Sequence, residues 1–339
     1  MRYGKVMLIV CISMIALFGV SCVFANDAMN ETISVNDLDV RELRTIDNGI
    51  NNTNQIVGDS LSASVVYFDA SANSDGDGSQ SNPYKYYKSD RVDYGTTAYF
   101  ANGVYDITEA NNIYSSSAYK TTFIGQSIEN TIFKSNLPNK FDFTVTDDSY
   151  FVLSNLTMVG VHINNQANLI ADNVMFKNSM GFDSNYAPSL SYAYISKIFD
   201  ATCGGVIICD TPSNKFTTLN LTDCYFNDNS ASSGGVIATY NTIANIQNCV
   251  FYNSSASRFG GVIYGIKSSL NIKTSSFELN RAKYAGAIYA NSSTVNLKDS
   301  YFSLSQAYSF GGVIASFSSQ LDINHVDFKD YASLDDAGG

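Results

Sequence analysis

This chain of 339 residues is poor in the residue types that several common functions require. It has only two histidines, His162 and His325, and none of its six cysteines forms a C-x2-C pair, which argues against a zinc site. Lysine and arginine total 20 against 31 acidic residues, and this negative balance argues against nucleic-acid binding. No Gly-x-Ser-x-Gly elbow, Walker motif or Cys/His pair is present, so the motifs do not predict an enzyme.

Long apolar runs are also missing, except at the start of the chain. Arg2 and Lys5 precede an apolar stretch from Val6 to Val20, and Val23-Phe24-Ala25 fits a cleavage site. Residues 1–25 are therefore predicted to be a secretory signal peptide, which leaves Asn26 as the first mature residue. No other segment is long and apolar enough to span a bilayer. We expect a secreted protein, extracellular or at the cell surface.

Two other interpretations of the first residues stay open. An uncleaved signal would act as a membrane anchor. Cys22 would mark a lipoprotein, although Gly19 is a poor match three residues before it. Residues 26–62 are polar and acidic with few aromatic residues, which predicts a flexible lead-in. Loss of the signal lowers the net charge from −11 to −13, as suits an acidic surface protein.

Amphipathic patterns of period 3.6 are absent from the mature sequence, and a longer repeat takes their place. Its mark is a glycine pair followed by two small or branched residues, at steps of 26, 25, 26 and 27 residues from Gly234 onward. The repeat glycines are Gly204, Gly205, Gly234, Gly235, Gly260, Gly261, Gly286, Gly311 and Gly312, with Ala285 at one first position and Gly338-Gly339 at the end. A period of this length indicates a solenoid.

A second series of residues keeps the same period. It consists of Phe226, Phe251, Phe277, Phe302 and Phe328, each preceded five positions earlier by Leu or Ile. Asn or Asp stands before that aliphatic residue: Asn220, Asn245, Asn271, Asn296 and Asp322. Equivalent residues of stacked coils lie above one another, so Phe should stack on Phe inside the solenoid. Asn should pair with Asn through the side-chain amides.

These series predict an all-β protein, a right-handed parallel β-helix with coils of about 25 residues. Each coil is expected to hold three short strands and three turns, because the apolar residues alternate over short runs. A β-sandwich, the alternative, would not keep residue identity in register over five units. We expect a cap and the first coils over residues 63–125 and the regular helix over 126–339.

Two parts of the repeat are irregular. From Phe176 to Phe226 is 50 residues, so the stretch between Asn178 and Cys203 contains either a degenerate coil or a long loop. Thr131-Ile132-Phe133 reads as an earlier coil. Gly338-Gly339 falls where another coil should begin, and a solenoid end needs a cap. We therefore expect a longer protein.

The repeat resembles a known family. Phe226–Asn229 and Phe277–Asn280, in the pattern F-x-x-N followed by GGVI or AGAI, resemble the repeats of chlamydial polymorphic membrane proteins. They resemble even more the adhesin-like β-helix proteins of methanogenic archaea, and the resemblance covers residues 63–339. It implies adhesion or binding at a cell surface, with glycans or proteins as partners. Ser254, Ser305 and Tyr331 depart from the asparagine of the motif.

Other functions compatible with this resemblance stay open. A structural stalk could present a downstream domain, such as a papain-like peptidase or an anchor. A polysaccharide lyase or glycoside hydrolase would need clustered carboxylates or calcium on one sheet face. Charged residues are sparse in the regular coils, and no catalytic residue or organic cofactor is predicted.

Candidate metal and cysteine sites are few. Asp69, Asn73, Asp75 and Asp77 place oxygen ligands at alternate positions among glycines, as a Ca2+ loop would, but no bidentate glutamate follows. The alternative is a polar turn. Cys224 and Cys249 occupy one position in neighbouring coils, where either a disulfide or two stacked thiols would fit; thiols are favoured because Ser275 and Ser300 follow them. Cys203 and Cys209 complete the mature set.

Surface features give two more hypotheses. Six sequons are candidates for N-glycosylation: Asn30, Asn51, Asn155, Asn220, Asn253 and Asn291. Tyrosines cluster outside the repeat at Tyr84, Tyr86, Tyr87, Tyr186, Tyr192 and Tyr194. They would either stack on sugars or pack beneath loops.

Overall fold

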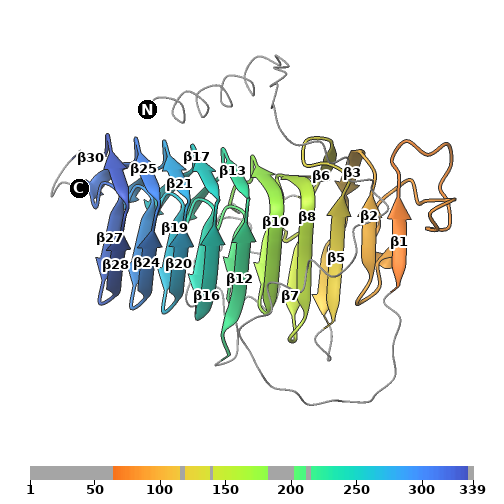
Figure 1. The fold of residues 1–339 in the computed structure, drawn as a ribbon, viewed down its shortest axis with the longest axis horizontal. Helices are drawn as coiled ribbons and strands as arrows, with labels where there is room; N and C mark the ends of the chain where they lie inside the picture. Colours follow the sequence, from red (N-terminus) through yellow and green to blue (C-terminus); the bar gives the residue numbers. More distant parts are fainter. Residues whose placement is uncertain (1–63, 115–118, 138–139, 182–201, 211–214, 335–339) are drawn as a thin grey trace, which may run out of the picture. The chain divides into compact units, whose positions relative to one another are not determined.

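The computed structural model describes residues 64–114, 119–137, 140–181, 202–210 and 215–334. It confirms the fold prediction, because parallel strands stack into a right-handed β-helix with coils of about 26 residues (Figure 1). The only helix among these residues is the 3-10 turn η2 (Ser89–Arg91), and none is long and apolar enough to cross a membrane. The solenoid belongs to a compact unit that spans Leu61–Gly339.

Each regular coil contains four strands, not the three expected. One coil consists of β16 (Thr242–Gln247), β17 (Val250–Tyr252), β18 (Ser255–Phe259) and β19 (Ile263–Ile266). A residue with positive φ lies at each of its four corners: Asn248, Asn253, Gly260 and Lys267. Left-handed backbone turns the chain within a single residue, so a coil of this length has room for a fourth strand.

The strands form three parallel sheets. The largest has two faces, and strands of the first face are β1 (Val65–Phe68), β2 (Thr97–Phe100), β5 (Lys120–Gly125), β8 (Tyr150–Val159), β10 (Asn168–Lys177), β12 (Thr217–Thr222), β16, β20 (Ser269–Lys273), β24 (Thr294–Lys298) and β28 (Gln320–Asn324). Its second face holds β3 (Gly103–Ile107), β6 (Thr131–Ser135), the ends of β8 and β10, β13 (Tyr225–Asn227), β17, β21 (Ser276–Glu278), β25 (Tyr301–Ser303) and β29 (Asp327–Lys329).

The other two sheets flank the glycine corner. The eight-stranded sheet holds β4 (Asn111–Tyr114), β7 (Phe143–Thr146), β9 (Ile163–Asn165), β11 (Ile207–Cys209), β15 (Ile237–Tyr240), β19, β23 (Ile288–Asn291) and β27 (Ile314–Phe317). The five-stranded sheet holds β14 (Ser230–Ser233), β18, β22 (Arg281–Tyr284), β26 (Gln306–Phe310) and β30 (Ala332–Ser333).

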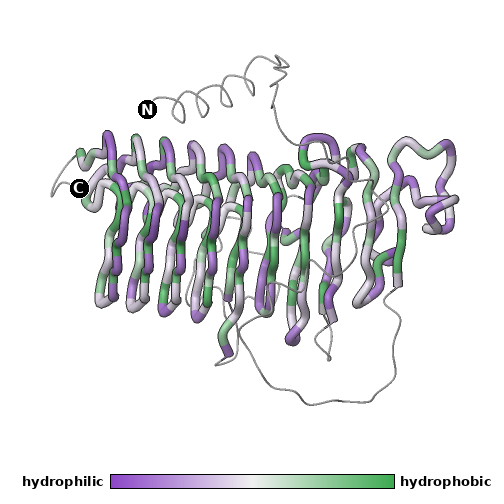
Figure 2. The backbone as a smooth tube through the Cα atoms, in the orientation of Figure 1, coloured by the Kyte–Doolittle hydropathy of each residue, from purple (hydrophilic) through white to green (hydrophobic). Residues whose placement is uncertain are grey.

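The predicted phenylalanine stack forms the centre of the core. Phe176, Phe226, Phe251, Phe277, Phe302 and Phe328 are stacked with ring centroids 4.4–5.2 Å apart. Buried and exposed residues alternate along β16, where Thr242, Ala244 and Ile246 are buried and the residues between them are exposed. Figure 2 shows hydrophobic and hydrophilic residues interleaved along the coils. Phe133 pairs in register with Met158, and Met158 with Phe176, so the early coil at Thr131 is confirmed.

Two kinds of asparagine contact join the coils. On the outer face, the side chains of Asn245, Asn271 and Asn296 each donate to the amide oxygen of the preceding asparagine, at 2.8–2.9 Å, as predicted. Inside, the F-x-x-N asparagines bridge backbones. Asn280 Nδ2 donates to the Phe251 carbonyl at 3.1 Å, while its Oδ1 accepts the Ser254 N–H at 2.9 Å. The motif therefore holds adjacent coils together.

The irregular interval advances the solenoid by one coil. Phe176 pairs directly with Phe226, and Asn168 with Thr218, which excludes a degenerate coil between them. Residues 182–201 lie outside the described residues, as do the predicted signal peptide and lead-in. In contrast, the preceding coil is short, because Tyr150 pairs with Asn168 only 18 positions later.

Candidate functional site

Six aromatic side chains gather on the outside of the solenoid, around the glycine corner. They are Phe259, Tyr264, Tyr284, Tyr289, Phe310 and Phe317, and we call them the aromatic strip. Phe259, Tyr284 and Phe310 each directly precede the first residue of a glycine corner. Tyr264 and Tyr289 each directly follow the G-x-I segment of such a corner. Phe317 is exposed, and the other five are partly buried. The strip thus runs over three successive coils, on β18 and β19, β22 and β23, and β26 and β27.

The rings contact one another along and across the coils. Along the axis, Phe259 lies 5.3 Å from Tyr284, and Tyr284 lies 4.7 Å from Phe310, between centroids. Across the corner, Phe259 and Tyr264 are stacked at 5.5 Å, while Tyr289 lies 4.6 Å from Phe259. The rings therefore form one connected apolar surface.

The backbone explains why these rings meet. In β19, Ile263 and Gly265 are buried and Tyr264 between them faces outward. Phe259 faces outward from the end of β18, on the other side of Gly260, whose φ is 60°. Outward side chains diverge around a convex bend, so contact between Phe259 and Tyr264 indicates a re-entrant corner. The strip lines this corner.

Positively charged side chains border the strip. The Arg258 guanidinium carbon lies 5.0 Å from the Phe259 centroid, and Lys283 Nζ lies 5.2 Å from the Tyr284 centroid. Both cations are exposed. Partial burial raises the pKa of Tyr289, with a smaller contribution from Tyr284, so its hydroxyl stays neutral and can donate hydrogen bonds. The surface combines ring faces, hydroxyl groups and cations.

The same corner is filled by smaller buried side chains in earlier coils. Cys203, Ile208, Ala238 and Phe141 form a cluster of their own, separate from the main core, and Tyr264 packs against it. Cys203 and Ser233 occupy the register positions of Phe259 in the two preceding coils. The exposed rings are thus a property of the last coils described.

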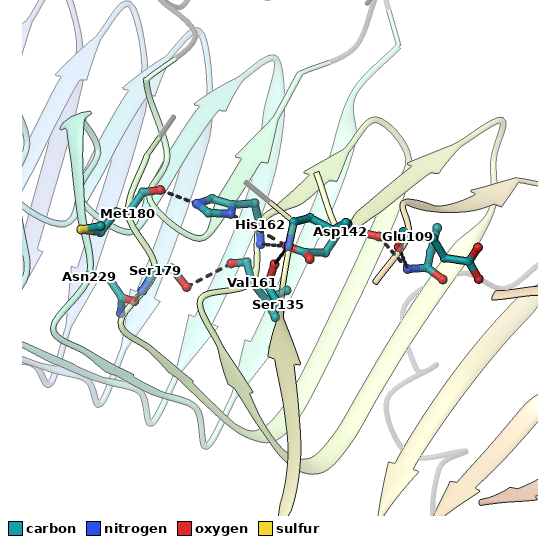
Figure 3. Close-up of polar contacts among 10 residues, drawn as sticks. Glu109, Ser135, Asp142, Val161, His162, Ser179, Met180 and Asn229 are labelled. Carbon is teal, nitrogen blue, oxygen red and sulfur yellow. Dashed lines mark hydrogen bonds and ion pairs between the residues drawn. The ribbon is translucent and has the colours of Figure 1, made fainter. Parts of the chain in front are cut away.

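A second candidate cluster lies in two earlier coils, where Asp142 and His162 replace the valines of later coils (Figure 3). Asp142 Oδ2 accepts the backbone N–H of His162 at 2.8 Å, and the His162 Nδ1 atom lies 3.8 Å from that oxygen. The Nε2–H group donates to the Met180 carbonyl oxygen. Asn111 joins the cluster by donating to the Asp142 carbonyl oxygen at 2.9 Å.

Burial controls the titration of this pair. It raises the pKa of Asp142 to about 6, although hydrogen bonds from Ser135 and the His162 backbone act to lower that pKa. Burial lowers the pKa of His162, although its hydrogen bond to the Met180 carbonyl acts to raise that pKa. Nε2 is committed to a backbone carbonyl, and Nδ1 lies beyond hydrogen-bond distance of the carboxylate. The contacts of the pair thus join the backbones of neighbouring coils, which is a structural role.

The predicted calcium ligands are partly bonded to protein groups. Asp75 Oδ1 accepts from Arg91 at 2.8 Å and from the Lys85 N–H at 2.9 Å, and Arg91 holds the Asp75 pKa at about 2. Asp69 and Asp77 accept the backbone N–H groups of Ser71 and Ser79. Asn73 is exposed.

Among the described residues, no group of three or more His, Cys, Asp or Glu side chains is placed to hold a metal ion. The polar turn explains the bonds at Asp69, Asp75 and Asp77, and the calcium site stays a prediction. A rise in melting temperature on adding calcium would support it, and an unchanged melting temperature would contradict it.

The four described cysteines are buried, and no disulfide joins them to one another. Cys224 Sγ donates to the Thr222 carbonyl oxygen, and Cys249 Sγ to that of Gln247, each at 3.2 Å. In the next coil, Ser275 Oγ makes the same bond to Lys273 at 2.9 Å. Burial raises the pKa of Cys209 to about 12 and that of Cys224 well above its usual value. These cysteines therefore act as small core residues.

The sequons differ in how their amide groups are used. Asn155 Nδ2 donates to the carbonyl oxygens of Gly125 and Gln126, both at 2.9 Å. Asn253 Nδ2 donates to Asp228, and Asn220 Oδ1 accepts from Asn245. A glycan at Asn155 would break bonds between coils. Asn30 and Asn51 lie outside the described residues, Asn291 ends β23, and glycosylation stays a prediction.

The sequence had pointed to other tyrosines as a binding surface. Tyr87 is buried against four core rings, Tyr84 lies beneath Arg91, and Tyr86 is exposed. Tyr186, Tyr192 and Tyr194 lie outside the described residues. The overlooked signal was the recurrence of an aromatic residue beside the glycine pair, at Phe259, Tyr284 and Phe310, with the spacing of the repeat itself.

Comparisons with protein-family models, with curated proteins and with solved structures find no match for this chain. The resemblance to adhesin-like and polymorphic membrane protein repeats therefore stays a prediction.

Proposed function

We propose that this protein is a secreted, adhesin-like surface protein that binds glycans through the aromatic strip. The observation that carries the proposal is the connected set of six outward rings at the re-entrant corner. Aromatic faces pack against the C–H faces of sugar rings, and tyrosine hydroxyls add hydrogen bonds. The predicted signal peptide supports placement outside the cell.

The solenoid suits a ligand that is itself a chain of similar units. Equivalent rings of neighbouring coils lie 4.7–5.6 Å apart along the axis, at Phe259, Tyr284 and Phe310 and at Tyr264 and Tyr289. A polysaccharide laid along the axis would meet a ring at each coil. Each contact would be weak, and several together would give useful affinity.

A glycan array tests this proposal. We expect the protein to bind a subset of polysaccharides without releasing product. The triple substitution Phe259→Ala, Tyr264→Ala and Tyr289→Ala should weaken binding at least about tenfold, since each lost ring contact contributes of the order of 1 kcal/mol. The melting temperature would show whether the variant is still folded.

The chain offers a matched control. Tyr67 and Tyr99 form another stacked pair on the outer face of β1 and β2, with centroids 5.3 Å apart. Their replacement by alanine should leave glycan binding unchanged. An array without any bound glycan, or equal binding by the folded triple variant, would contradict the proposal.

A structural stalk is the second candidate, and the continuous ladders favour it. Phenylalanine and asparagine stacks join each coil only to its neighbours, which makes a regular rod suited to displaying another domain. A stalk would bind no glycan through Tyr264 and Tyr289. Release of reducing ends or unsaturated products from polysaccharides would instead favour the enzyme alternative.

A further inference from the structure

Charge is segregated around the C-terminal coils. The segments that form the glycine corner and its two flanking strands are residues 229–242, 254–268, 279–293 and 304–319. They contain four cations, Arg258, Lys267, Arg281 and Lys283, and no aspartate or glutamate. This is unusual in a chain with 31 acidic residues, so the side that carries the strip is positive within a negative molecule.

The acidic residues of the same coils lie elsewhere. They occupy the strands and corners of the seventeen-stranded sheet, at Asp223, Asp228, Glu278, Asp299, Asp322, Asp327 and Asp330. The acidic residues of these coils thus all lie on the seventeen-stranded sheet, which also carries Lys273, Lys298 and Lys329, whereas the charged residues of the corner segments are all basic.

Two of the cations belong to the strip by position. Arg258 and Lys283 each directly precede a ring of the strip, Phe259 and Tyr284, and those rings are register partners in adjacent coils. The Arg258 guanidinium carbon lies 5.0 Å from the Phe259 ring centroid and Lys283 Nζ lies 5.2 Å from that of Tyr284, which is cation–π distance. A chain bound along the strip would therefore meet a positive charge beside a ring at two successive coils.

We propose that the strip selects an acidic polysaccharide, whose sugar rings stack on the aromatic rings while its carboxylates pair with Arg258 and Lys283. This inference rests on the proposed glycan binding and adds the chemical class of the ligand. Charge-assisted bonds to carboxylates suit arginine in particular. Single-stranded nucleic acid is the other polyanion whose rings could stack on the strip, and the test below includes it.

Polygalacturonate and its fully methyl-esterified form provide the test, because they share one backbone and differ in charge. We expect the acidic polymer to bind at least about tenfold more tightly at low salt, with the advantage falling as salt screens the charges. The double substitution Arg258→Gln and Lys283→Gln should remove most of this advantage. It should leave binding of the neutral ester largely unchanged.

Lys273→Gln with Lys298→Gln is the matched control. These lysines are register partners on exposed positions of β20 and β24, so the variant loses the same charge elsewhere on the coils. It should bind both polymers as the unchanged protein does.

The possible outcomes separate the two proposals. The proposal of an acidic ligand is overturned if both polymers bind equally well, or if the two double variants lose the same affinity for polygalacturonate. Neither result contradicts glycan binding itself. Tighter binding of single-stranded DNA than of polygalacturonate also overturns the proposal of an acidic polysaccharide. If neither polymer binds, the acidic class is wrong, and only an empty glycan array or indifference to the ring substitutions removes the proposed function as well.

Discussion

The two glycines of each corner have different physical tasks. The first, as at Gly260, adopts a φ near +60°, and Ala285 adopts the same conformation in another coil. The second, as at Gly261, faces the next coil, where an added Cβ would lie 2.1 Å from the Gly286 carbonyl oxygen. At the first position an added Cβ would lie 2.0 Å from the Ile263 carbonyl oxygen of the same corner, so the corner itself must adjust, as it does around Ala285. A side chain at the second position would instead push two coils apart.

Paired alanine substitutions should reveal this difference. Gly260→Ala is expected to cost about 1–2 kcal/mol of unfolding free energy, because the alanine must adopt a left-handed conformation and the Ile263 carbonyl must shift within the corner, as the corner at Ala285 allows. Gly261→Ala should cost about 3 kcal/mol, because backbone atoms must move. Urea denaturation measures both. A larger loss for Gly260→Ala would show that conformation, not coil spacing, fixes the glycine pair.

Asp142 predicts a pH-dependent stability difference. Its pKa is raised to about 6 in the folded chain, so the buried carboxylate destabilises the fold above that pH and less so as pH falls toward 3.8. Asp142→Asn keeps an acceptor for the His162 N–H and should raise the unfolding free energy by about 1–3 kcal/mol at pH 8.

The advantage of the asparagine variant should shrink toward pH 4. Comparison with the unchanged protein cancels most of the effect of His162, whose lowered pKa acts in the opposite direction. Denaturation curves across this range give the difference directly. A gain that increases on acidification would mean that the carboxylate stabilises the fold when it is charged.

At the scale of strands, the sequence predicted the ladders well and the strand count poorly. Phenylalanine and asparagine recur in register because each stacks on its own kind, and that leaves a periodic trace. The fourth strand left no periodic trace in the sequence, because the residue at its corner varies from coil to coil. Asn248, Thr274, Asp299 and His325 occupy equivalent corners and share the same left-handed conformation. Stacked coils impose that conformation whatever the residue. The aromatic strip was missed because it occupies only three coils.

The phenylalanine stack should contribute most to stability in its middle. Phe251 is fully buried between rings at 4.8 and 4.7 Å, so Phe251→Ala should cost about 3–5 kcal/mol. Phe328 has one stacked neighbour in the described chain, at 5.2 Å, and is only partly buried. Its replacement should cost clearly less by urea denaturation, and equal costs would argue against a cooperative stack.

The outer asparagine ladder allows a smaller test. Asn245 both donates to Asn220 and accepts from Asn271, so Asn245→Ala should remove about 1–2 kcal/mol. Gln247→Ala, on the same exposed face of β16, serves as the control and should change stability little. If both substitutions cost the same, the ladder bonds are equivalent to bonds with water.

At the scale of the whole solenoid, fold and candidate function share one origin. Repetition sets the coil, the coil aligns equivalent positions along an axis, and outward aromatic and basic residues at those positions become a continuous surface. The fold could be predicted from the period together with the short alternating apolar runs. The binding surface could not, because it depends on which residues fill the outer positions of particular coils.

Chemical footprinting of the tyrosines tests the central claim most directly, because it locates the ligand on the folded protein. With polygalacturonate bound, Tyr264, Tyr284 and Tyr289 should be protected from modification, while the exposed Tyr99 and its partly exposed stacking partner Tyr67 stay reactive. Protection of Tyr67 and Tyr99 instead, or unchanged reactivity at all five while the polymer is bound, would contradict the account.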